Sequence, residues 1–208
     1  MQIKIPPKSS QEKNPNFLEN VIIPDQTHSN NIVEIITWKE DLTDCDGIFT
    51  SRKNNFKLAI KTADCSAIVF YDEKNYWIIH AGWRWWVNWI IEKMLKKFDN
   101  PEIFVAPFLK SFEIQKDFCY DLIYKKFWDK YFEEKSRDVA LLHLYNEKEK
   151  LPHLYNEDNK IIFNFEKALK SLLWTKANFD KRNTLEDEDF YSWRRDKTNW
   201  RNYTIIEK

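Results

Sequence analysis

Glycine is nearly missing from this chain, which has 2 glycines among 208 residues. An average protein carries roughly 7% glycine, and glycine makes many of the positive-φ corners that turns require. A fold with many turns must therefore place other residues at such corners. Tryptophan, by contrast, is abundant, with 10 residues.

Net charge and long apolar runs are also missing. Lys+Arg and Asp+Glu number 33 each, so the chain lacks the basic excess expected of a protein that binds nucleic acid or an anionic membrane. No run approaches the length of a membrane span, and residues 1–10 lack the apolar core of a signal peptide. We therefore expect a cytoplasmic protein whose partners are neither nucleic acid nor membrane.

Cysteine is too scarce for a disulfide framework. The three cysteines, Cys45, Cys65 and Cys119, are odd in number and far apart, which suits a reducing compartment. A chain that is 43% hydrophobic over 208 residues can build one sizeable core. We expect a single domain over residues 1–208, in which the polar residues 1–20 form an irregular lead-in.

Apolar periodicity predicts short strands and helices in no regular order. The predicted strands are 31–37, 48–50, 56–61, 66–71, 76–80, 102–107, 160–165 and one at the C-terminal end. The predicted helices are 83–98, 111–135 and 166–173. The sequence of residues 143–147 recurs at 153–157, which we interpret as a short duplication in a surface region. Without regular βαβ alternation, the pattern indicates an α+β fold.

A thiol and two imidazoles stand at the ends of predicted strands. Cys65 directly precedes the strand 66–71, His80 ends the strand 76–80, and His28 lies shortly before another strand. If the first two strands pair antiparallel, Cys65 and His80 meet at one edge of a sheet. Two histidines and one cysteine are a ligand set for catalytic zinc, which keeps its fourth position for water and lowers the pKa of that water to roughly 7.

Two charged residues near these ligands are candidates for catalysis. Asp64 adjoins Cys65 and could act as a general base or accept a hydrogen bond from a ligand. Arg84 begins a predicted helix, where it could hold an anion, although a surface arginine without a role is the alternative. A buried cysteine is usually structural, and we interpret Cys45 and Cys119 in that way.

Four motifs resemble those of the YfiH-like laccase-domain family: QTH ending at His28, TADC ending at Cys65, HAGWR starting at His80, and YSWRRD ending at Asp196. The resemblance implies a layered α/β/α/β sandwich similar to the catalytic domain of cytotoxic necrotizing factors. It also implies that His28, Cys65 and His80 hold zinc. The implied activities are phosphorolysis of adenosine, inosine and methylthioadenosine, and deamination of adenosine.

The resemblance further implies a pocket for a small-molecule nucleoside and phosphate. Arg194, Arg195 and Arg201 are candidates for binding phosphate or closing this pocket. One alternative is a hydrolase that edits wrongly built cell-wall precursors, a role also attributed to the family. The alternative outside enzymes is a structural metal site, for which Cys45 or Asp46 would have to supply a fourth ligand.

The family's older label, multicopper polyphenol oxidase, can be compared with the chain's own ligands. Two histidines and a cysteine suit copper, and a blue-copper site would add a weak axial methionine. The chain has 2 methionines and 4 histidines, too few histidines for the multicopper cluster of a laccase. We therefore favour zinc over copper and a phosphorylase over an oxidase.

Several tryptophans stand where the family usually carries glycine: Trp77, Trp85, Trp89, Trp174 and Trp200, with Trp38 a further candidate. Together, the 10 tryptophans and 2 glycines come close to a normal glycine content. We hypothesise that the gene uses UGA as a glycine codon that is translated here as tryptophan. A divergent, aromatic-rich member of the family is the alternative.

Overall fold

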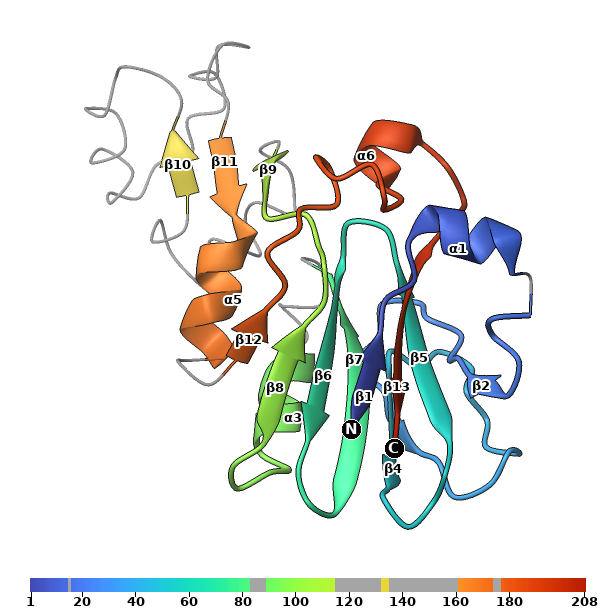
Figure 1. Ribbon diagram of the computed structural model, residues 1–208. Helices are drawn as coiled ribbons and strands as arrows, with labels where there is room; N and C mark the ends of the chain where they lie inside the picture. Colours follow the sequence, from blue (N-terminus) through green and yellow to red (C-terminus); the bar gives the residue numbers. More distant parts are fainter. Residues whose placement is uncertain (15, 83–88, 115–131, 135–160, 174–176) are drawn as a thin grey trace.

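The computed structural model describes residues 1–14, 16–82, 89–114, 132–134, 161–173 and 177–208. The strands of these residues form three sheets, which short helices flank (Figure 1).

The largest sheet has six strands. Their spatial order is β12 (Ala177–Phe179), β8 (Glu102–Val105), β6 (Ser66–Tyr71), β7 (Asn75–Ala81), β4 (Gly47–Ser51) and β3 (Ile32–Glu34). β6 and β7 are antiparallel, and Ala67 lies opposite His80. The turn between them is stabilised by Asp72, whose Oδ1 accepts hydrogen bonds from the N–H groups of Lys74 and Asn75. The structure thus confirms the predicted strands 66–71 and 76–80 and their antiparallel pairing.

The second sheet has four strands, in the order β1 (Gln2–Lys4), β13 (Asn202–Glu207), β5 (Lys57–Thr62) and β2 (Val21–Ile22). β5 pairs antiparallel with β13 and then continues through Ala63, Asp64 and Cys65 into β6. The chain therefore crosses from one sheet to the other at Cys65 (Figure 1).

A third, smaller sheet consists of β10 (Phe132–Glu134), β11 (Ile161–Asn164) and β9 (Ser111–Ile114). The described helices are α1 (Lys8–Lys13), α3 (Ile90–Leu95), α5 (Phe165–Leu173) and α6 (Trp193–Asp196). Lys8 of α1 and Asp196 of α6 form an ion pair, and Figure 1 shows these two helices beside the same end of the four-stranded sheet. Within the described part of the chain, no helix is long and apolar enough to cross a membrane.

The alternation of side chains along β6 explains the layers. Val69 points into a core that also contains Leu58 of the four-stranded sheet. Phe70, on the opposite face, belongs to a second core with Ile91 of α3 and Leu169 of α5. Because both faces of β6 are buried, its sequence is a continuous apolar run. The two larger sheets therefore pack face to face, and α3 and α5 cover the outer face of the six-stranded sheet.

These elements form a mixed α/β fold. Most strand pairs are antiparallel, and the parallel pairs are β2–β5, β3–β4 and β8–β12. The predicted α/β/α/β order of layers is wrong for the described residues. The core between the two larger sheets is made of strand and loop residues, with no helical residue among them.

Residues 1–20 also differ from the prediction. They contain β1, which pairs with β13, and the helix α1, so they are not an irregular lead-in. A strand of three residues is too short for its alternation to be recognised, and its partner lies at the other end of the sequence. The two-residue strand β2 and the three-residue strand β12 escaped prediction for the same reason.

Two predicted helices are only partly described. The described ends of the predicted helix 111–135 are strands, because Phe112 pairs with Phe163 across β9 and β11, and β10 continues the same sheet. The predicted helix 83–98 is represented by α3 alone. The duplicated residues 143–157 lie outside the described residues.

The tryptophans at predicted glycine positions have different environments. Trp89 has a φ of 64°, at the N-terminal end of α3, and this left-handed conformation is one that glycine favours. Trp77 is buried in β7, where its ring stacks 3.7 Å from that of Phe49 and its Nε1–H has no hydrogen-bond partner. Trp38 and Trp200 are exposed, whereas Trp85 and Trp174 lie outside the described residues.

Candidate metal centre and pocket

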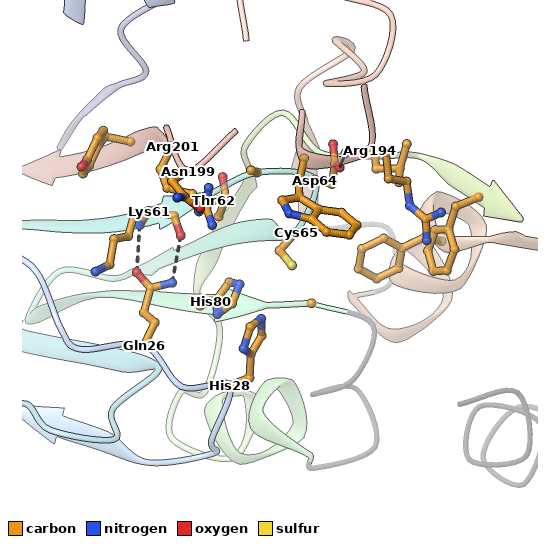
Figure 2. Close-up of a pocket in the computed structure, with 17 residues that line it drawn as sticks. Gln26, His28, Lys61, Thr62, Asp64, Cys65, His80, Arg194, Asn199 and Arg201 are labelled. Atoms are coloured by element: carbon orange, nitrogen blue, oxygen red, sulfur yellow. Dashed lines mark hydrogen bonds between the residues drawn. The ribbon is translucent and has the colours of Figure 1, made fainter. Parts of the chain in front are cut away.

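A pocket of about 740 Å³ lies where the chain crosses between the two larger sheets. Its walls come from the loop before β3, the crossing itself, the end of β7, and the segment that leads through α6 into β13. The lining residues are Gln26, His28, Lys61, Thr62, Ala63, Asp64, Cys65, His80, Gly82, Leu109, Phe112, Phe165, Trp193, Arg194, Asn199, Arg201 and Tyr203. In Figure 2, Cys65 and His80 lie between Lys61, Asn199 and Arg201 on one side and Arg194 on the other.

The three predicted metal ligands meet at the wall of this pocket. One ligand atom each from His28, Cys65 and His80 lies within 4.8 Å of the other two. The two imidazole ring centroids are 4.8 Å apart. Cys65 precedes β6 and His80 lies near the end of β7, so the antiparallel pairing of these strands brings thiol and imidazole together.

A buried carboxylate, expected from the sequence only as an alternative fourth ligand, contacts one of these histidines. Asp46 is fully buried, and its Oδ1 lies 2.7 Å from Nδ1 of His80. The backbone N–H of His80 also donates to the backbone carbonyl of Asp46, at 2.7 Å. Asp46 stands in an acidic turn immediately before β4, where the sequence alone does not separate it from its exposed neighbours.

His28 lies on a loop whose backbone is strained. Its φ is 74°, in the left-handed region that residues other than glycine rarely adopt. On either side of it, the N–H groups of Thr27 and Ser29 donate to Oδ2 of Asp46, at 3.2 and 2.6 Å. Asp44 holds the same loop by accepting a hydrogen bond from the Thr27 hydroxyl.

In the metal-free protein, the thiol and the imidazole shift each other's pKa. Burial raises the pKa of Cys65, but the positive charge of His80 and hydrogen bonds from both histidines lower it by a larger amount. The pKa of Cys65 therefore falls from 9.0 to about 6. Burial lowers the pKa of His80, but the Cys65 thiolate and the hydrogen bond to Asp46 raise it from 6.5 to about 9. Cys65 and His80 therefore form a thiolate–imidazolium pair near neutral pH.

The two residues considered as a fourth ligand are engaged elsewhere. The Cys45 thiol is buried and donates to the Gly47 carbonyl at 3.0 Å, and burial raises its pKa. The Asp46 carboxylate binds His80 and the His28 loop. Among the described residues, the group of metal-binding side chains contains His28, Cys65 and His80 and no fourth member.

Asp64 has its carboxylate turned toward the C-terminal part of the chain. Its Oδ1 accepts a hydrogen bond from the Thr184 hydroxyl at 2.9 Å, and its Oδ2 accepts one from the Arg194 backbone N–H at 2.8 Å. Asp64 itself has a φ of 82°. The residue predicted as a general base thus fastens the segment 184–194 beside the pocket, and both of its oxygens are occupied.

The predicted arginines have different positions. Arg194 lines the pocket, and its guanidinium carbon lies 4.7 Å from the ring centroid of Phe112. Arg201 also lines the pocket, and its Nη1 donates to the carbonyls of Thr198 and Trp200. Arg84 lies outside the described residues.

Arg195 is not among the pocket-lining residues, so its predicted contact with substrate has no support in its position. Its guanidinium pairs with Asp196 and donates to a ring of backbone carbonyls, those of Thr184, Leu185, Asp187 and Phe190. Arg195 therefore stabilises the same loop, residues 184–194, that Asp64 holds beside the pocket.

Comparison with known proteins identifies the family. Residues 11–207 match the profile of the family described as multi-copper polyphenol oxidoreductase laccase. The chain belongs to this laccase-domain family. The resemblance seen in its motifs is thereby confirmed.

Relatives of this laccase-domain protein include proteins named purine nucleoside phosphorylase. The one from Aquifex aeolicus is 26% identical over 196 residues, which cover 90% of this chain and 82% of that protein. The one from Staphylococcus epidermidis is 34% identical over 112 residues, which cover 46% of this chain and 42% of that protein.

Two crystal structures share the fold. The hypothetical protein YfiH of Bacillus licheniformis aligns with a TM-score of 0.68 and 20% identity, over 96% of this chain and 78% of that one. YlmD from Geobacillus stearothermophilus aligns with a TM-score of 0.64 and 19% identity, over 95% of this chain and 77% of that one.

The ligand atoms of this laccase-domain protein fit a metal ion by their chemistry. Two imidazoles and one thiolate are donors that both zinc and copper accept. The carboxylate on Nδ1 of His80 is the partner that a metal-bound histidine usually has on its other ring nitrogen.

Proposed function

We propose that this laccase-domain protein is a zinc-dependent purine nucleoside phosphorylase that cleaves adenosine, inosine and S-methyl-5′-thioadenosine and also deaminates adenosine. The observation that carries the proposal is the meeting of His28, Cys65 and His80 at the wall of a pocket with cationic and aromatic side chains. The relatives named purine nucleoside phosphorylase support it.

His28, Cys65 and His80 would hold the zinc. The bound ion would supply a Lewis acid that works at neutral pH. Asp46 keeps the proton of His80 on Nδ1, so that Nε2 stays available on the side of the pocket. Asp64 keeps the segment 184–194 in place next to these ligands.

The pocket offers suitable groups for both substrates. In phosphorolysis, a phosphate oxygen attacks the ribose carbon that bears the base, and the base leaves with the electrons of the broken C–N bond. Lys61, Arg194 and Arg201 supply positive charge for the phosphate. Phe112 and the half-exposed Trp193 supply flat apolar surfaces for a purine.

A second candidate is a hydrolase that uses Cys65 as its nucleophile, the class to which an editing enzyme for cell-wall precursors would belong. The contacts from Cys65 to His80 to Asp46 place a thiol, a base and an orienting carboxylate in sequence. In that reaction the Cys65 thiolate would attack a carbonyl carbon, and the leaving group would depart with a proton from His80. Water would then hydrolyse the thioester and release Cys65, so that no metal is needed.

Product analysis separates these candidates. Zinc-loaded protein is incubated with adenosine, with and without phosphate, beside His80→Ala and the surface variant Trp38→Ala. Adenine formed only with phosphate, lost in His80→Ala and retained in Trp38→Ala, is the expected result, accompanied by some inosine. No product from folded, zinc-loaded protein contradicts the nucleoside proposal. Activity on a carbonyl substrate that persists in a chelator favours the thiol hydrolase.

A further inference from the structure

The side chain of Asp46 contacts both His80 and the backbone beside His28, the two histidines of the candidate metal centre. It is fully buried, immediately before β4, between β7 and the loop that carries His28. One carboxylate oxygen contacts the ring of His80, and the other accepts from the N–H groups on either side of His28.

The first oxygen determines which nitrogen of His80 carries the proton. Oδ1 lies 2.7 Å from Nδ1, and a carboxylate can only accept, so Nδ1 must donate. Nε2 is therefore the nitrogen that faces Cys65 and remains free to bind a metal when the ring is neutral. The backbone bond from the His80 N–H to the Asp46 carbonyl holds the two residues together a second time.

The second oxygen holds the backbone around His28. Oδ2 accepts from the N–H groups of Thr27 and Ser29 and from the Ser29 hydroxyl, at 3.2, 2.6 and 3.1 Å. His28, between these two N–H groups, has a φ of 74°. Such a conformation persists in a residue other than glycine only where surrounding contacts impose it, and Oδ2 supplies contacts on both sides.

We propose that Asp46 is a positioning residue for both histidines, setting the tautomer of His80 with one carboxylate oxygen and the backbone of His28 with the other. This inference rests on the proposed role of the two histidines as metal ligands. The buried carboxylate of Asp46 would thus orient two of the three ligands without binding the metal itself.

The variant Asp46→Asn tests this role at nearly constant shape. The N–H groups of Thr27 and Ser29 need an acceptor, so the amide oxygen must face them and the amide NH₂ must face Nδ1 of His80. Nδ1 then has to accept, the proton moves to Nε2, and His80 loses its ligand atom. Turning the amide over would instead place its NH₂ against the two N–H groups of the His28 loop.

Two further variants complete the design. Asp44→Asn is the matched control, because Asp44 holds the same loop through Thr27 and Asn31 and lies outside the group of metal-binding side chains. Asp46→Glu keeps the negative charge but moves the carboxylate by one methylene. A purely electrostatic role predicts that Asp46→Glu binds zinc normally, whereas a positioning role predicts that it does not.

The measurement is zinc affinity, determined by titrating the metal-free proteins in competition with a chromophoric chelator. We expect Asp46→Asn to bind zinc about 10–100-fold more weakly than the unsubstituted protein, as is typical of lost outer-shell partners. Asp46→Glu should also be weakened, and Asp44→Asn should not. The absorption spectrum of the cobalt(II)-loaded proteins should change in the two Asp46 variants and stay constant in Asp44→Asn.

Equal zinc affinity in all four proteins overturns the inference, and so does normal affinity in Asp46→Glu, even if Asp46→Asn fails to fold. An unsubstituted protein that binds no zinc overturns both this inference and the proposed function. An unsubstituted protein that binds zinc tightly but acts on no nucleoside contradicts the proposed function alone.

Discussion

Oδ1 of Asp64 accepts a 2.9 Å hydrogen bond from the hydroxyl of Thr184, a residue 120 positions further along the chain. Its other oxygen accepts from the backbone of Arg194. The residue beside Cys65 thus holds the C-terminal segment against the pocket, and this contact gives the first prediction.

Replacing Asp64 by alanine leaves the Thr184 hydroxyl and the Arg194 N–H without their acceptor. Hydrogen bonds to a charged group contribute about 1.5–3 kcal/mol each, so the free energy of unfolding should fall by about 2 kcal/mol or more. Thr184→Val, which removes one bond, should cost less. Urea unfolding measures both, and zinc content should be unchanged. A variant that keeps its stability but loses zinc would show that Asp64 acts on the metal.

Replacing Arg194 should weaken substrate binding, whereas replacing the adjacent Arg195 should lower the free energy of unfolding. Arg195→Gln removes a guanidinium that donates to four backbone carbonyls, so it should lower the free energy of unfolding by about 2 kcal/mol. Arg194→Gln should change stability by less than about 0.5 kcal/mol but weaken nucleoside or phosphate binding. Thermal unfolding and equilibrium binding test the pair, and the reverse pattern would contradict the assignment.

Alkylation of Cys65 in metal-free protein should have an acidic midpoint. The pKa of Cys65 is lowered to about 6 and that of His80 raised to about 9, so the thiolate–imidazolium pair is complete between these values. The rate of reaction with iodoacetamide, followed by peptide mapping, should therefore rise through about pH 6. In His80→Gln the midpoint should move toward 9.0. A midpoint near 9 in the unsubstituted protein would contradict the pair.

The same pair should make the stability of the metal-free protein nearly independent of pH around neutrality. The raised pKa of His80 adds stability below its usual value of 6.5, and this is lost as the pH rises through about 9. The lowered pKa of Cys65 adds stability above its usual value of 9.0, and this is lost as the pH falls through about 6. Because the loss through His80 is matched by the gain through Cys65, urea midpoints should stay nearly constant between about pH 6 and 9. A steep change of the midpoint within this range would contradict the pair.

Removing metal should lower the thermal midpoint. A ligand at 100 times its Kd stabilises the native state by about 2.7 kcal/mol, or roughly 5–10 °C for a domain of this size. A metal chelator should therefore reduce the Tm by that amount, and His28→Ala should abolish the difference. Cys45→Ala, which removes a buried thiol outside the ligand set, should retain it. A chelator effect that survives in His28→Ala would place the metal elsewhere.

Trp89→Gly should stabilise the protein. Trp89 has a φ of 64° and is 56% exposed, so its backbone is strained while more than half of its surface already faces solvent. Relieving a left-handed conformation is worth about 1 kcal/mol, measurable by urea unfolding. Trp38→Gly, at an equally exposed site without positive φ, should not stabilise. A loss of stability in Trp89→Gly would contradict the strain.

The glycine-codon hypothesis has its own test. Peptide mass spectrometry of the protein from its native source should find glycine at Trp77 and Trp89 if UGA is read as glycine there. A peptide that carries intact tryptophan at both positions would end the hypothesis and leave an aromatic-rich family member.

The hairpin that carries Cys65 and His80 could be predicted because its strands are apolar over their whole length and the turn between them is polar. The meeting of His28, Cys65 and His80 at one site could be predicted from strand ends and family motifs. The short strands β1, β2 and β12 could not be predicted, because each is defined by a distant partner and not by its own pattern.

The residues that support the site were harder to recognise for a similar reason. Asp46 stands among acidic neighbours, and only its burial and its contact with His80 distinguish it from Asp44. Arg194 and Arg195 are adjacent and chemically identical, so the sequence cannot show that one lines the pocket and the other braces a loop. In both cases the function is decided by the direction of a side chain in the folded protein.

The pairing of Ile3 with Ile206 has a consequence for biosynthesis. β13 lies between β1 and β5, so the four-stranded sheet is incomplete until the last strand has left the ribosome. The three candidate ligands and Asp46 emerge much earlier, in a stretch dominated by local strand pairing, which forms quickly. The residues of the candidate metal centre can therefore come together while β5 is still an open edge, the kind of edge at which unfinished proteins aggregate.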